Sequence, residues 1–194
     1  MRKLFCCALM MTLFLLPGCA VVEKGTNPEQ IALNIRSDYL AAKNISSQVS
    51  LTADYGHRVY EYEMDLQVQG DLTTLTLTAP DYASGITAQI QNQQGILSYQ
   101  DISVETGPLN PEGLTPMSSV PILLDAVRSG YITSCILEDS GLLRIDCGQP
   151  DAPPGTGTEM VLWFQPETSA LTQGDILVDG FRHITCRFSQ FTKE

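Results

Sequence analysis

A strict alternation of apolar and polar residues between positions 60 and 69 constrains the fold of this chain more than any other feature. Successive side chains of a β-strand point to opposite faces, so this pattern is typical of a strand with one buried and one solvated face. It predicts an antiparallel sheet that needs a covering layer on one side only. The apolar members are Tyr60, Tyr62, Met64, Leu66 and Val68.

Similar segments, separated by turn residues, recur along the chain and predict about ten strands. The expected strands include residues 49–55, 73–77, 86–90, 96–104, 133–137, 142–147, 160–165, 171–178 and 181–191. Residues 107–121 hold four prolines and are expected to form a loop that crosses the structure.

Two helices are expected beside these strands. Asn27 and Pro28 suit the N-cap and first position of a helix running to about Lys43, with Gln30 as its capping-box partner. The apolar stripe of this helix is Ile31, Ile35, Tyr39 and Ala42. A short second helix is expected to start at Ser118 or Ser119 and to end at Gly130.

These elements predict an α+β fold. A sheet of about ten strands with one apolar face should curl, giving an open half-barrel wrapped around the long N-terminal helix and the short second helix. Residues 28–194 are expected to form this single domain.

The first eighteen residues have the parts of a signal peptide: Arg2 and Lys3, an apolar run over residues 4–16, and a small residue at the cut. The run is shorter than the roughly 20 residues that span a bilayer. Its ending, Leu16-Pro17-Gly18-Cys19, resembles the lipobox of bacterial lipoproteins. An ordinary secretory signal with a chance cysteine is the alternative.

The lipobox resemblance implies that Cys19 becomes the lipidated first residue, that residues 19–27 form a tether, and that the partner of this anchor is a membrane. The expected location is therefore extracytoplasmic, attached to the cell membrane, or to the outer membrane in a host with two membranes. The formal net charge of −11 argues against a nucleic-acid partner.

Three further cysteines follow the lipobox. A turn centred near Gly141 would place Cys135 opposite Cys147, so these two could form a disulfide or remain buried thiols. Cys186 alternates with Ile184 and Phe188, which favours a core position.

Catalytic and cofactor signatures do not emerge from the sequence. Glu61, Glu63 and Asp65 could suggest paired catalytic carboxylates, but they are better explained as the solvated face of a strand. His183 and Cys186 would point to opposite faces of their strand, which disfavours a dyad. We therefore predict a protein that is not an enzyme and that has neither a cofactor nor a metal site.

The order of these elements resembles the lipoprotein carrier and receptor family (LolA/LolB-like), and is similar to spore germination lipoproteins of spore-forming bacteria. The resemblance rests on the lipobox, the helix at 28–43, the segments 60–80 and 85–86, and the ending from Trp163-Phe164 and Pro166 through Gly180 to Phe188. It implies the open half-barrel. The arginine that family carriers use for lipoprotein release has no matched position here, so transport is not carried over.

Two functions from different classes follow. The first is a membrane-anchored, non-catalytic binding module whose apolar sheet face accepts a hydrophobic ligand, an acyl chain or a lipoprotein. The alternative is a tethered interaction protein that docks or activates a cell-envelope enzyme, as in spore germination. The competing explanation for the same residues is that they form a sealed core around the helices. The candidate ligand-binding residues are Tyr62, Met64, Leu66, Leu75, Leu77, Ile86 and Ile90.

Overall fold

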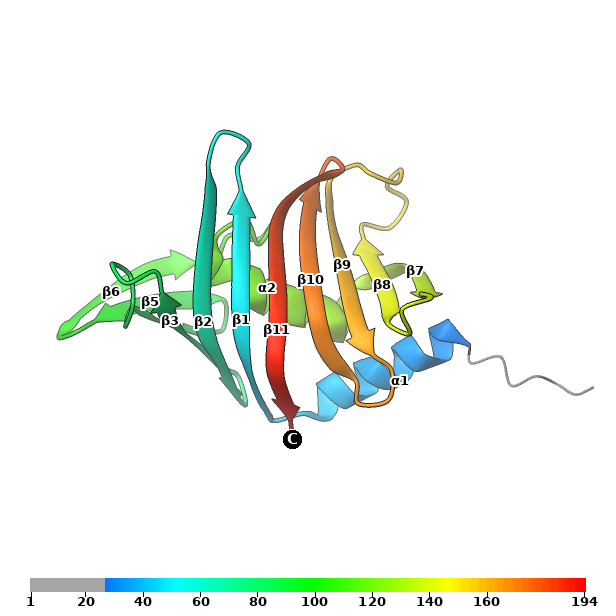
Figure 1. Ribbon diagram of the computed structural model, residues 1–194, viewed down its shortest axis with the longest axis horizontal. Coiled ribbons are helices and arrows are strands. Elements are labelled where there is room, and N and C mark those ends of the chain that lie inside the picture. The colour runs from blue at the N-terminus through cyan, green and yellow to red at the C-terminus, as the bar shows by residue number, and fades with distance from the viewer. Residues whose placement is uncertain (1–26) are drawn as a thin grey trace, which may run out of the picture.

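The computed structural model describes residues 27–194 (Figure 1). The predicted signal peptide, the lipidation site Cys19 and all of the tether except Asn27 lie outside these residues. The elements are α1 (Pro28–Ala41), β1 (Asn44–Asp54), β2 (Val59–Gln69), β3 (Leu72–Ala79), β4 (Thr87–Gln91), β5 (Gln94–Tyr99), β6 (Ile102–Pro108), α2 (Pro116–Ser129), β7 (Tyr131–Leu137), β8 (Leu143–Gly148), β9 (Thr158–Gln165), β10 (Ala170–Val178) and β11 (Phe181–Lys193).

The strands form one antiparallel sheet in the order β6-β5-β4-β3-β2-β1-β11-β10-β9-β8-β7. The predicted α+β class is confirmed, with eleven strands where about ten were expected. The alternating segment at 60–69 lies in β2, and Met64, Leu66 and Val68 are buried there. The sheet is open, with β6 and β7 at its two edges.

Helix α1 begins where its capping residues predict. The Asn27 side chain accepts a hydrogen bond from the backbone N–H of Glu29 at 2.9 Å, and Pro28 occupies the first turn. The expected partnership of Gln30 in a capping box is wrong, because its amide donates to the Asn34 side chain instead. The helix ends at Ala41 and buries Ala32, Ile35 and Tyr39.

Helix α2 differs from the short helix expected. It starts at Pro116 and is 14 residues long, as long as α1, so part of the expected proline-rich loop is helical. Thr115 is the N-cap and exchanges capping-box hydrogen bonds with Ser118, which therefore lies inside the helix. Proline is compatible with the first turn because the first N–H groups have no partner within the helix.

Helix α1 lies against the β7–β8 end of the sheet, and α2 passes behind its middle. Helix α1 contacts α2, β7 and β8, and α2 contacts β9, β10 and β11 (Figure 1). The Tyr39 hydroxyl accepts a hydrogen bond from the Leu171 N–H at 3.1 Å, and its ring meets Phe164 edge-on. Arg36 donates to the carbonyls of Val127 and Gly130. These contacts fasten the two helices to each other and to the β8–β11 half of the sheet.

Of the two alternatives for Cys135 and Cys147, the structure has free thiols, with Cys147 buried and Cys135 partly exposed. The β7–β8 hairpin pairs Leu137 with Leu143, so its turn is centred one residue earlier than the sequence suggested. Cys135 therefore pairs with Ile145, and the two cysteines are diagonal neighbours. Burial raises the pKa of the Cys147 thiol to about 11.

Cys186 is fully buried, as predicted, and its pKa is raised to about 12 by the same cause. Within residues 27–194, no helix has the length and apolar character needed to cross a membrane.

Candidate ligand pocket

The other half of the sheet carries an apolar pocket. Strands β2, β3, β4 and β5 form its floor, and its volume is about 430 Å³. This volume lies within the range of about 300–1,000 Å³ that is typical of small-molecule sites. The floor residues are Tyr62, Met64, Leu75, Leu77, Ala88 and Leu97.

The connection between β3 and β4, residues 80–86, forms one wall of the pocket and contributes Tyr82, Ala83 and Ile86. Backbone hydrogen bonds hold this loop against β3: the Gly85 N–H donates to the Leu77 carbonyl, and the Leu77 N–H donates to the Ile86 carbonyl, both at 2.8 Å. The loop therefore has a defined position beside the floor.

The start of α2 forms the opposite wall, with Thr115, Pro116 and Met117. Tyr55 holds the approach to this helix, because its hydroxyl donates to the Leu114 carbonyl at 2.7 Å. Met117 lies directly over Gly95 of β5, where an added Cβ would be 3.1 Å from the Met117 methyl carbon. The missing side chain at position 95 therefore lets Met117 reach the sheet.

The chemistry of the pocket is apolar throughout. None of its lining residues is charged, and its polar atoms belong to the Tyr62 and Tyr82 hydroxyls, to Thr115 and to the backbone. Burial raises the pKa of Tyr62, and the neighbouring Tyr82, Tyr55 and Tyr60 raise it further. Such a lining favours contact with apolar groups that leave water.

The structure brings five of the seven predicted ligand-binding residues together at this pocket. Leu66 and Ile90 do not line it: Leu66 is sealed in the core, and Ile90 lines a neighbouring cavity. Sequence reasoning missed Ala88, Leu97 and the walls contributed by Tyr82, Ala83, Thr115, Pro116 and Met117. Alternation with Ile86 and Ile90 could have identified Ala88, but no local pattern places the start of α2 over β5.

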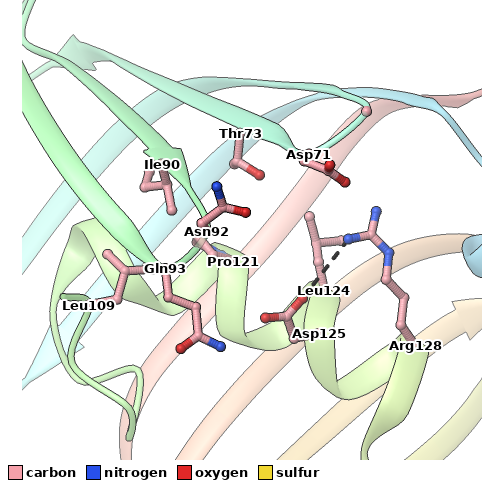
Figure 2. Close-up of a pocket in the computed structure, with 11 residues that line it drawn as sticks. Asp71, Thr73, Ile90, Asn92, Gln93, Leu109, Pro121, Leu124, Asp125 and Arg128 are labelled. Carbon is pink, nitrogen blue, oxygen red and sulfur yellow. Dashed lines mark ion pairs between the residues drawn. The ribbon is translucent and has the colours of Figure 1, made fainter.

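The cavity beside Ile90 is polar and smaller, about 230 Å³ (Figure 2). Asp71 reaches it from the β2–β3 turn, Asn92 from the β4–β5 turn, and Asp125 and Arg128 from α2. Burial raises the pKa of Asp125, and Arg128, 3.9 Å away, opposes that rise. Arg128 also donates to the Tyr39 carbonyl, so its guanidinium helps to hold the two helices together.

Metal-ligating side chains do not gather anywhere in residues 27–194: no group of three His, Cys, Asp or Glu residues could hold an ion there.

Comparisons with known proteins identify the fold. No protein-family model and no curated protein matches the sequence. Among solved structures, an uncharacterized conserved protein from Thermus thermophilus is similar with a TM-score of 0.52 at 9% identity, over 86% of this chain and 87% of that chain.

Two named proteins show weaker likeness. The LolA superfamily protein NE2245 from Nitrosomonas europaea has a TM-score of 0.44 at 9% identity, over 86% of this chain and 93% of that chain. The GerS lipoprotein, solved with the CwlD amidase from Clostridioides difficile, has a TM-score of 0.46 at 13% identity, over 86% of this chain and 95% of that chain. The predicted resemblance to LolA-superfamily and germination lipoproteins is confirmed as structural similarity, and at these identities it concerns the fold alone.

Proposed function

We propose that this protein is a membrane-anchored, non-catalytic module that binds a single hydrocarbon chain in the pocket over β2–β5. The observation that carries the proposal is the pocket itself: about 430 Å³ lined by apolar side chains, without a charge among them. A pocket of this size suits one small apolar ligand such as an alkyl chain. The half-barrel curvature and the anchor at Cys19 stay predictions.

Burial of hydrocarbon supplies the affinity. Each methylene removed from water contributes about 0.8 kcal/mol, and immobilising the ligand offsets part of that gain. Because the lining residues hold no cation, a carboxylate or phosphate head group would remain in solvent at the mouth. The pocket therefore selects for the chain rather than for its head group.

A photo-crosslinking experiment tests this proposal. The full chain, held in membrane discs, is irradiated with a 14-carbon fatty acid that carries a diazirine, and the labelled peptides are identified by mass spectrometry. We expect label on peptides that contain Met64, Leu77 or Met117, and competition by the unlabelled fatty acid.

Two variants with the same substitution give the control. Ile86→Gln places an amide in the apolar wall and should reduce labelling roughly tenfold, by loss of buried methylene area. Ile122→Gln alters a half-buried isoleucine of α2 that lines a different cavity, and should leave labelling unchanged. Equal labelling of the two variants, or label distributed away from β2–β5, would refute the proposal.

The alternative function, docking or activation of a cell-envelope enzyme, stays a prediction. GerS was solved with the CwlD amidase. For this chain, the apolar pocket favours ligand binding.

A further inference from the structure

The two edges of the sheet are finished differently. Helix α1 lies against β7, whereas β6 lies at the far end of the sheet from that helix (Figure 1). Residues 102–106 of β6 are all exposed, with Ile102 at 69% and Val104 at 56% of full exposure. Such an uncovered edge presents a row of backbone groups without strand partners.

Strand β6 carries little of the protection that usually prevents edge pairing, namely Glu105 and an irregularity at one end. Natural edge strands carry lysine, an internal proline or a bulge that turns them away. The seven residues of β6 contain no Lys or Arg, and Pro108 stands only at its end. Its one register irregularity, between Gly95 and Ile96, lies at the end away from the β5–β6 turn and leaves residues 102–105 in regular pairing.

The turn fixes which backbone groups of β6 face outward. Tyr99 and Ile102 pair across a two-residue turn, so they are a hydrogen-bonded pair. Val104 lies two residues further along the strand, so its pair with Leu97 is also hydrogen-bonded. The alternate residues, Ser103 and Glu105, therefore direct their backbone N–H and C=O groups away from the sheet.

The side chains of β6 also differ between the two faces. Ile102 and Val104 share the face of Leu97, which lines the apolar pocket. Ser103 and Glu105 lie on the opposite face. A strand added here would meet apolar side chains on one face and a carboxylate on the other.

We propose that β6 accepts an extended segment of a partner protein as a twelfth strand, and that this segment alternates apolar residues with lysine or arginine. Backbone hydrogen bonds supply the pairing, Ile102 and Val104 contact the apolar residues, and Glu105 faces the basic ones. A second copy of this chain fits poorly, because its own β6 holds no Lys or Arg that could face Glu105.

A labelled seven-residue peptide of alternating valine and lysine is the probe. Its binding to the full chain in discs of zwitterionic lipid is followed by fluorescence anisotropy. Ser103→Pro removes one outward N–H and leaves the backbone hydrogen bonds to β5 in place, and should weaken binding about tenfold. Both this variant and its control lose the hydrogen bond between the Ser103 and Ser98 hydroxyls. The matched control, Ser103→Ala, keeps that N–H and should bind within about twofold of wild type.

Charge provides a second variant. Glu105→Lys should weaken binding of the valine–lysine peptide severalfold and strengthen binding of a valine–glutamate peptide. Two further peptides carry N-methyl groups on their odd or on their even residues. Only the one that loses the amides facing β6 should fail to bind, and this measurement does not depend on the folding of any variant.

Equal affinity of Ser103→Pro and Ser103→Ala, with no difference between the two N-methylated peptides, would overturn the proposal. So would a wild-type dimer that Ser103→Pro converts to monomer, because the occupant would then be a second copy. Fatty-acid labelling in the pocket should be the same in Ser103→Pro as in wild type, so the strand site and the ligand pocket can fail separately.

Discussion

The β8–β11 half of the sheet and the β2–β5 half are built from the same alternating pattern, but the two helices pack along the first, whereas only part of α2 reaches over the second. Under the helices, Leu143, Leu162, Phe164, Leu171 and Ile176 are fully buried. Over β2–β5, residues of the same types line a pocket. An apolar strand face therefore becomes sealed core or the floor of a pocket according to what lies over it.

Truncating one leucine in each half gives the largest expected difference. Leu162→Ala leaves a hole in a sealed core and should lower the free energy of unfolding by about 2–5 kcal/mol. Leu77→Ala enlarges a pocket that already exists, and should cost less than about 1.5 kcal/mol. Urea denaturation followed by circular dichroism measures both. Similar losses in the two variants would mean that the pocket is packed as tightly as the core.

Adding one methyl group to a glycine in each half gives a smaller difference. The Cβ of Gly174→Ala would lie 2.8 Å from a methyl carbon of the fully buried Leu123, so α2 would be pushed from β10 at about 1–3 kcal/mol. Gly95→Ala would displace the Thr106 hydroxyl and the flexible Met117 at the pocket wall, and should cost less. The melting temperatures of the two variants measure this difference. A larger loss for Gly95→Ala than for Gly174→Ala would contradict the comparison.

The smallest expected effect concerns Asp175 on the outer face of the covered half. Its side chain is fully buried, and its Oδ2 lies 2.7 Å from Nε of Arg182. Burial raises its pKa, with Arg182 opposing. Because the folded state binds this proton more readily than the unfolded state, the Asp175 contribution to unfolding free energy increases as the pH falls from above the raised pKa to the ordinary value of 3.8.

The variant Asp175→Asn isolates that contribution. On acidification, wild type should gain stability relative to the variant, by about 1.4 kcal/mol in unfolding free energy for each unit by which the pKa is raised. Denaturation at several pH values checks this, with the exposed Glu63→Gln as the control for losing one carboxylate. A constant difference would show that the Arg182 ion pair balances burial, and an opposite trend that it outweighs burial.

Local patterns predicted the elements whose causes are local. The alternation at 60–69 predicted β2, and Asn27 with Pro28 predicted the start of α1. The start of α2 was misplaced because Pro116 was assigned to a loop, although a proline after an N-cap threonine is compatible with a first turn. The strand partner of Cys135 was predicted wrongly because the turn is centred one residue before Gly141.

By itself, the sequence determined the α+β class, the apolar face of the sheet and five of the residues that line the pocket, because strand periodicity assigns each side chain to a face. Only the tertiary structure decided that the helices cover β7–β11, that Met117 and the 80–86 loop wall the pocket, and that β6 is left bare. These outcomes depend on contacts such as Tyr39 with Leu171 and Arg36 with Gly130, between residues more than 90 positions apart, which no local pattern encodes.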